Sequence, residues 1–304
     1  MLTMIEAAKL MNNPLQTGII EIFAANNPVL ERLPFVDIQG NAFRYNREGA
    51  LPGIAFRGIN ESYTESTGVI NPQTETLTIC GGDSDYDVAL VKMGSGSNDL
   101  RAAHDAMKSK ALTLTWLKTF FDGDSSMRPR EFDGLNARLD GTTQEVKASS
   151  GAGGATLTLD KVDELIDAIQ GTPDILLMNA KMRRKINNLV RAAGQATEVV
   201  NDQFGRRIDA YAGIPIGVVG DDSEGDAILG FDEDDGSANL DTTSIYAVRF
   251  GLDGLHGIQT EAMNVRDLGE LDTKPAYRTR IEWYSGFVVK HPKTVARLKW
   301  INQG

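Results

Sequence analysis

A long polar insertion between two alternating segments constrains this chain more than any other feature of its sequence. Residues 42–47 and 74–80 alternate apolar and polar side chains, as β-strands with one buried face do. Residues 48–72 are rich in Gly, Pro, Ser, Thr and Asn, so the two segments are predicted to form an extended hairpin. Because a two-stranded ribbon is only marginally stable in water, this hairpin is expected to lie against a neighbour.

The clearest helix is predicted between Asn98, which suits the N-cap, and Gly123, which suits the position after the C-terminus. About 24 residues would give a rod of roughly 36 Å, twice the usual length of a helix. Such a rod indicates a spine that crosses a large, flat domain. Its predicted buried face consists of apolar residues three and four apart: Leu100, Ala103, Met107, Ala111, Leu114, Leu117 and Phe121.

The segments around the hairpin and the helix are more irregular. Residues 1–38 contain Asn-Pro steps that interrupt helices and favour extended chain, so they are predicted to form an arm without a core of its own. Residues 87–93 are predicted to form a short strand. Residues 148–154, with their Ser and Gly steps, are the predicted linker.

An α/β unit is predicted for residues 155–220, where amphipathic helices alternate with buried strands. Pro215 has no amide proton to donate to a sheet, so it indicates that its strand lies at an edge. The chain becomes strand-like again from Tyr277 to Ile301, with one break near Pro292.

Charge is distributed unevenly along this chain of 304 residues, whose 31 bases and 42 acids leave a net charge of −11. That balance argues against a nucleic-acid binder that depends on phosphate contacts. Residues 221–272 hold 14 acids and two bases, whereas residues 274–304 hold seven bases and one acid. Such asymmetry can guide self-association. The alternative is a solvated acidic loop beside a basic edge strand.

A predicted helix after residue 179 carries a second basic feature. Residues 175–197 contain five bases and no acid. A solvated helix face is the default interpretation, and contact with an acidic neighbouring subunit is the alternative.

No constellation of catalytic residues is visible. The single cysteine, Cys80, excludes an intramolecular disulfide framework and a multi-cysteine zinc site. The chain contains no Gly-x-Ser-x-Gly elbow, P-loop or complete dinucleotide fingerprint. Asp83, Asp85 and Asp87 have calcium-loop spacing but lack the glycine and the glutamate of that loop, so solvated turns are predicted there. No enzymatic activity, cofactor or bound metal is therefore expected.

The composition is that of an ordinary soluble chain, with 24% charged and 41% hydrophobic residues. No apolar run approaches the ~20 residues that span a bilayer, and the N-terminus shows no secretory signal. The sequence therefore predicts a protein that is made in a cytoplasm and has no contact with membranes.

The order of these elements, from arm through hairpin, spine helix and α/β unit to a strand return, resembles that of the major capsid proteins of tailed bacteriophages, the Hong Kong 97-type capsid fold. The most specific similarity lies near the C-terminus. It is carried by SIYAVRFG (244–251), GLHGIQ (254–259), VRDLGEL (265–271), RTRIEWY (278–284) and HPKTVARL (291–298), with EFDGL (131–135) and LLMN (176–179) as further local matches.

The resemblance implies an α+β fold of five parts. In the family, axial domains gather around hexamer and pentamer axes, and the extended loop, or E-loop, lies across an adjacent subunit. The implied parts are an N-terminal arm (1–38), an E-loop hairpin region (39–93), a peripheral domain with the spine helix (94–150), an α/β axial domain (151–272) and return strands of the peripheral domain (273–304).

By this resemblance the chain is expected to be a structural coat protein and not an enzyme. It would self-assemble into hexamers and pentamers of an icosahedral head shell that encloses double-stranded DNA without sequence-specific binding. A separate scaffolding protein, a portal and a decoration protein are the other expected partners, with assembly in the host cytoplasm and a final location in the virion. The alternatives are an encapsulin-type bacterial nanocompartment, which shares the fold, and an α/β enzyme.

Charged residues of the hairpin, the basic helix and the acidic segment are the candidates for subunit contacts. No residue is expected to be catalytic, to ligate a metal or to hold a cofactor. The candidates are Arg44, Arg47, Glu48, Arg57, Glu61 and Glu65 in the hairpin, Lys181, Arg183, Arg184, Lys185 and Arg191 in the helix, and Asp232, Glu233, Asp234 and Asp235 in the acidic segment.

The type member of this family carries a covalent cross-link between an E-loop lysine and an asparagine of a neighbouring subunit. The present chain has Lys9 and then no lysine until Lys92, so the hairpin carries only arginines as bases. A guanidinium stays protonated and cannot serve as the nucleophile. Mature particles are therefore expected to lack that cross-link.

Overall fold

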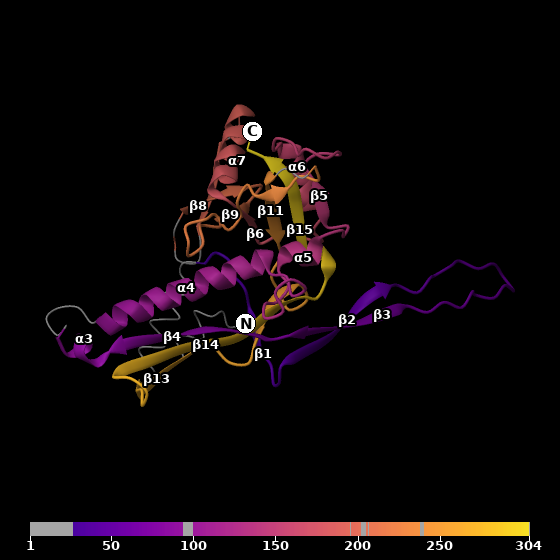
Figure 1. Cartoon of the computed structure of the whole chain (residues 1–304). Helices are drawn as coiled ribbons and strands as arrows, with labels where there is room; N and C mark the ends of the chain where they lie inside the picture. Colours follow the sequence, from indigo (N-terminus) through magenta and orange to yellow (C-terminus); the bar gives the residue numbers. More distant parts are fainter. Residues whose placement is uncertain are drawn as a thin grey trace.

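Two β-sheets, a long helix and a projecting hairpin make up the computed structural model, which describes residues 27–93, 100–194, 196–201, 205, 207–237 and 240–303 (Figure 1). The first described elements are β1 (Phe35–Asp37), β2 (Ala42–Ala50), β3 (Val69–Thr76), β4 (Thr78–Asp87), α3 (Val88–Met93), α4 (Leu100–Asp122), α5 (Leu135–Leu139) and β5 (Glu145–Lys147). They are followed by α6 (Leu159–Asp167), β6 (Ile175–Met178), α7 (Ala180–Ala192), β7 (Glu198–Asn201), β8 (Arg207–Tyr211) and β9 (Ile214–Val218). The last are β10 (Glu233–Asp234), β11 (Leu240–Val248), β12 (Leu255–Gln259), β13 (Asn264–Glu270), β14 (Ala276–Val289), the 3-10 turn η1 (Pro292–Thr294) and β15 (Val295–Asn302).

The five-stranded sheet is built around β14. One edge of β14 pairs antiparallel with β4 along its length, and the other edge pairs first with β13 and then with β12, whose far side holds β1. The spine helix α4 lies along this sheet (Figure 1). Trp116 of α4 packs against Trp283 of β14 with ring centroids 5.6 Å apart, so aromatic burial holds the helix to the sheet.

The eight-stranded sheet has the order β5-β15-β11-β6-β9-β8-β7, with β10 added beside β11. Alternate residues of β6 serve two cores, as the two-residue period of a strand requires. Leu176 and Met178 face α6 and α7, whereas Ile175 and Leu177 join the core that contains α4. The spine helix therefore packs between the two sheets, where Phe121 also contacts Tyr246 of β11 at 5.2 Å between ring centroids.

The strands do not divide between the sheets at the expected boundaries. β12 and β13 fall within residues 151–272, which were assigned to the axial domain, yet they pair in the sheet under the spine helix. β15 falls within residues 273–304, assigned to the peripheral domain, yet it pairs with β11 and β5 of the other sheet. The chain changes sheet at η1, and strand patterns along the sequence carry no information about which sheet a strand joins.

The buried face of the spine helix differs from the predicted stripe in its first half. Met107 is 67% exposed, whereas Asp105, Ser109 and Thr113 are buried. Tyr86 of β4 donates a hydrogen bond to Asp105, so this half of the interface is polar and satisfied. The prediction is correct at Leu117 and Phe121, which are buried near the end of the helix. An apolar pattern could not reveal a face whose burial depends on hydrogen bonds.

Other local predictions are also corrected. Residues 88–93 form helix α3 instead of a strand, and Asp87 accepts a hydrogen bond from the amide of Ala89 at its start. Pro215 lies in β9, between β6 and β8, and not at an edge. Pro215 is the register partner of Ala210 in β8, and pairing with β6 begins only at Ile216, so the missing amide proton is tolerated next to the turn between β8 and β9.

The end of the arm packs into the body of the chain. Val29, Leu30 and Leu33 are fully buried in the core around α4, and the side chain of Asn27 accepts hydrogen bonds from the amides of Val29 and Leu30. Residues 1–26 of the predicted arm and the predicted N-cap Asn98 lie outside the described residues. None of the helices in the described ranges has the length and apolar content needed to cross a bilayer.

Candidate subunit interface

The hairpin of β2 and β3 projects away from both sheets (Figure 1). Its tip carries large apolar side chains that contact almost nothing in their own chain: Leu51, Ile54, Phe56, Ile59 and Tyr63 are each at least 66% exposed, and the middle three at least 94%. Exposed apolar patches of this kind mark interaction surfaces. The sequence prediction concentrated on the charged residues of the hairpin and missed these apolar ones.

The base of the hairpin is fixed to the body. The Tyr45 hydroxyl and the Arg47 guanidinium both donate to the carbonyl oxygen of Val289, at 3.3 and 2.7 Å. Burial raises the pKa of Tyr45, which keeps its hydroxyl protonated as a donor. On the other strand, Glu75 accepts two hydrogen bonds from Arg138, at 2.6 and 2.8 Å. Arg47 is therefore occupied within the chain, which argues against its predicted role in a subunit contact.

The tip has some internal order of its own. Glu61 accepts a hydrogen bond from the amide of Gly58 at 2.8 Å, and Arg57 lies 5.1 Å from the ring centroid of Tyr63. Arg44 and Glu65 are exposed. Glu48 pairs through its backbone register with Ile70 in the hairpin ladder. Most of the charged hairpin candidates therefore accompany the apolar tip on a surface that faces solvent in the isolated chain.

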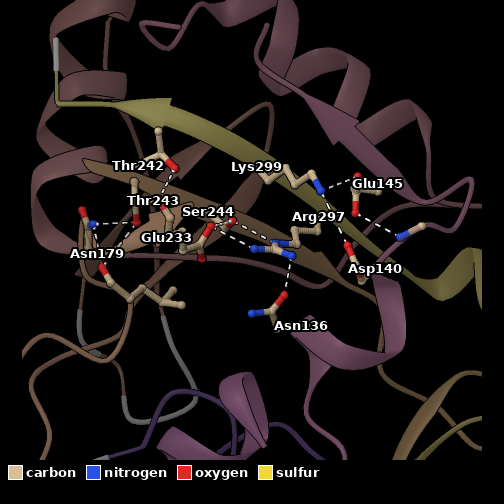
Figure 2. Close-up of polar contacts among 12 residues, drawn as sticks. Asn136, Asp140, Glu145, Asn179, Glu233, Thr242, Thr243, Ser244, Arg297 and Lys299 are labelled. Atoms are coloured by element: carbon tan, nitrogen blue, oxygen red, sulfur yellow. Dashed lines mark hydrogen bonds and ion pairs between the residues drawn. The ribbon is translucent and has the colours of Figure 1, made fainter. Parts of the chain in front are cut away.

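Two acidic candidates serve the chain's own fold. Glu233 pairs with Arg297 at 2.9 Å and accepts a hydrogen bond from Ser244 at 2.5 Å (Figure 2). Asp235 is 1% exposed and accepts hydrogen bonds from the amide and the hydroxyl of Ser237. Both carboxylates are engaged within the chain, which argues against their predicted role in a subunit contact. Asp232 and Asp234 remain exposed.

Arg297 lies at the centre of a polar cluster that joins several elements (Figure 2). Besides Glu233, it donates to Ser244 at 2.9 Å and to the side chain of Asn136 in α5. Next to it on β15, Lys299 lies 2.7 Å from Glu145 of β5. A charge is buried at acceptable cost only when it is paired and hydrogen-bonded, and this cluster meets that condition.

A cleft of about 630 Å³ opens beside this cluster, between the end of α4 and the strands β10 and β15. Asp122, the last residue of α4, lines it, and burial together with the nearby Glu233 and Asp232 raises the pKa of Asp122 to about 6. Arg128 and Arg297 oppose that shift. Within the described ranges, no group of three or more His, Cys, Asp or Glu side chains is arranged to hold a metal ion.

The predicted calcium-like acids lie on a strand and form ion pairs. Asp83 accepts from Arg280 at 2.7 Å, and Asp85 accepts from Arg278 at 2.6 Å, across the ladder between β4 and β14. The prediction of solvated turns was therefore wrong at these positions. Burial raises the pKa of Cys80 to about 11, which disfavours the nucleophilic thiolate.

The basic helix forms as predicted. Asn179 caps α7 by accepting a hydrogen bond from the amide of Met182 at 2.8 Å, and it donates to the carbonyl oxygen of Leu229. The ammonium of Lys181 lies 5.0 Å from the ring centroid of Phe231, and Arg183 lies 3.7 Å from Asp209. Lys185 is half-buried, and Arg184 and Arg191 are exposed on the solvent side of the helix.

Two family models of phage coat proteins match the sequence. The model of the major capsid protein GP7 matches residues 12–161, and the model of the SU10 major capsid protein matches residues 109–220. No curated protein matches the sequence significantly.

Solved structures share the fold over almost the whole chain. A SrpI encapsulin complex from Synechococcus elongatus has a TM-score of 0.67 at 16% identity and covers 91% of this chain and 89% of its own. The capsid of a native GTA particle has a TM-score of 0.64 at 15% identity and covers 92% and 90%. A chain from Mycobacterium phage Bobi has a TM-score of 0.61 at 13% identity and covers 90% of each. The predicted α+β capsid fold is confirmed.

Proposed function

This chain is a phage-type major capsid protein with the Hong Kong 97 fold, and from that premise we propose that it assembles into the hexamers and pentamers of an icosahedral head. The head would enclose packaged double-stranded DNA. The net charge of −11 suits a shell whose inner surface must not hold the packaged DNA tightly. In this role the chain is a structural protein of the virion, without enzymatic activity.

The projecting hairpin is the observation that carries this proposal. Its base is fixed by Tyr45, Arg47 and Glu75, while its apolar tip has no partner surface among the described residues. A ribbon that exposes Ile54, Phe56 and Ile59 to water is stabilised when those side chains are buried on another molecule. In a closed shell, each copy would supply the surface that the next copy's hairpin requires.

Negative-stain electron microscopy of the purified protein tests the proposal. Uniform closed shells, or rings of five and six subunits, are the expected result. A protein that stays monomeric over a wide range of concentration and salt, while remaining folded by circular dichroism, would contradict it.

An encapsulin-type compartment is the second candidate, favoured by the structural similarity to the SrpI encapsulin. The contents of particles isolated from the native source separate the two. Packaged DNA and a portal vertex support the phage head, whereas an enclosed enzyme supports the compartment.

The proposed head needs partners that this chain does not supply. We expect a scaffolding protein, a portal and a decoration protein to associate with it, and assembly to take place in the host cytoplasm. Co-purification of particles from infected cells, followed by mass spectrometry of their components, tests each partner separately.

A further inference from the structure

Helix α7 carries an excess of positive charge that ion pairs among the described residues neutralise only in part. It contains five bases and no acid. Lys181 and Arg183 have neighbours in Phe231 and Asp209. Among the described residues, no acidic side chain lies within ion-pair distance of the other three bases, which are Arg184, Lys185 and Arg191.

Several bases elsewhere in the fold are paired within the chain. Arg278 and Arg280 pair with acids of β4, and Arg297 pairs with Glu233. In a chain whose net charge is −11, the exposed basic face of α7 is a candidate for contact with an acidic surface of another molecule.

Helix α6 offers the complementary charge. It contains four acids and one base, and its apolar residues Val162 and Leu165 are buried against the sheet. Asp163 accepts a hydrogen bond from Tyr211, and Glu164 pairs with Lys161 at 2.6 Å. All four acids, which are Asp160, Asp163, Glu164 and Asp167, remain exposed.

The two helices lie in one layer of the molecule. Both pack on the same face of the eight-stranded sheet, α6 over β5 and β15 and α7 over β9. In a rotationally symmetric ring, each contact joins two different patches of the same chain at the same height along the axis. Where neighbouring copies of a ring meet through this layer, α7 of one copy can face α6 of the next.

We propose that the basic face of α7 docks against the acidic face of α6 in the adjacent copy of this chain, as a repeated contact within each ring. This inference rests on the proposed assembly and adds the pair of surfaces that specifies it. Both helices are rigidly packed on a sheet, so the contact needs little reorganisation of either copy. Electrostatic complementarity of this kind mainly fixes orientation and register.

The acidic segment of residues 221–235 is a less suitable partner for α7. Asp222 is already paired with Lys118 of the spine helix at 2.7 Å, and Glu233 is paired with Arg297. Glu233 and Asp122 line the same cleft at the end of the spine helix. These acids therefore contribute to contacts within their own chain.

Charge reversal with rescue tests the contact. Arg184→Glu with Arg191→Glu should lower the yield of shells by about tenfold, because each exposed pair contributes ~0.2–1 kcal/mol and the contact repeats around the ring. Glu164→Lys with Asp167→Lys should have the same effect. Combining all four substitutions in one chain should restore the yield. High salt, at which the Debye length is ~3 Å, should weaken the wild-type contact.

Each outcome has a definite meaning. Circular dichroism melting separates lost assembly from lost folding, and the neutral pair Arg184→Gln with Arg191→Gln replaces a reversal that fails to fold. Normal shells from either reversed pair would overturn the contact but leave the proposed assembly intact. Rescue of the α7 reversal by Asp221→Lys with Glu224→Lys, and not by the α6 reversal, would also overturn it. A wild-type protein that never forms particles would instead contradict the proposed function itself.

Discussion

Arg297 connects more elements than any other single side chain of the polar cluster. It reaches β10 through Glu233, β11 through Ser244 and α5 through Asn136. Replacing it by methionine should cost about 3 kcal/mol of unfolding free energy at most, because Glu233, whose side chain is only 17% exposed, would be left without its partner. Urea unfolding of the unassembled protein measures this loss.

The double variant Arg297→Met with Glu233→Gln should recover part of the stability, since it removes the uncompensated charge. Lys161→Met is the matched control, because its pair with Glu164 is exposed and should contribute only ~0.3–0.5 kcal/mol. Equal losses in Arg297→Met and Lys161→Met would show that the cluster around Arg297 contributes no more than a surface pair.

Asp122 gives the fold a specific pH dependence. Burial raises its folded-state pKa from the ordinary 3.8 to about 6, so its stabilising contribution is complete below 3.8 and is lost as the pH rises through about 6. Asp122→Asn stays neutral and should gain stability relative to the wild type over that range. The difference of roughly 2 pKa units corresponds to at most about 3 kcal/mol. Thermal melts at a series of pH values measure it.

Asp124 is the control for this measurement because its shift has the opposite sign. A hydrogen bond from the Ser126 hydroxyl, with a further one from the Ser126 amide, lowers the pKa of Asp124. Its contribution is present above the ordinary pKa and is lost on acidification. Asp124→Asn should therefore be less stable than the wild type near neutral pH, with a difference that shrinks as the pH falls. Identical pH profiles for both variants would contradict the assignment at Asp122.

At the level of elements, the hairpin is the part whose role lies outside its own chain. Replacing residues 51–68 with a short Gly-Ser turn preserves β2, β3 and the anchors at Tyr45 and Glu75. The variant should fold and stay soluble, yet fail to form stable shells, because the apolar tip is missing. Size-exclusion chromatography and circular dichroism provide the two readouts.

A full-length variant distinguishes the contribution of the apolar side chains at the tip from that of the hairpin's length and backbone. Ile54→Ser, Phe56→Ser and Ile59→Ser keep the hairpin but remove its three most exposed large apolar side chains. Shell formation should fall in this variant as well. Normal shells from it would assign the hairpin's role to its backbone, and an unfolded deletion variant would show that the tip contributes to the chain's own core.

At the scale of the whole particle, the absence of lysine between Lys9 and Lys92 has a direct consequence. No hairpin amine is available to form a covalent bond with a neighbouring subunit, so the contacts of the hairpin should be non-covalent. Mature particles boiled in detergent should give one band near 33 kDa on a gel. A ladder of larger bands that survives reducing agent would contradict this prediction.

The sequence by itself determined the elements whose signals are local. Asn179 caps α7 as predicted, the spine helix ends before Gly123, and the alternation of residues 42–47 yields a hairpin strand. Each of these depends on neighbours within a few residues, which periodicity and capping rules describe directly.

Tertiary structure alone decided the features that depend on distant partners. β12 joins the five-stranded sheet and β15 the eight-stranded sheet, each the reverse of what the sequence predicted. Glu233 pairs with Arg297, 64 residues away. Asp105 is buried because Tyr86 of another element supplies its hydrogen bond. An alternating strand pattern shows which face of the strand is apolar, and a charged residue shows which kind of partner it requires. Neither shows which surface of the folded chain supplies the contact, because that depends on how the whole chain packs.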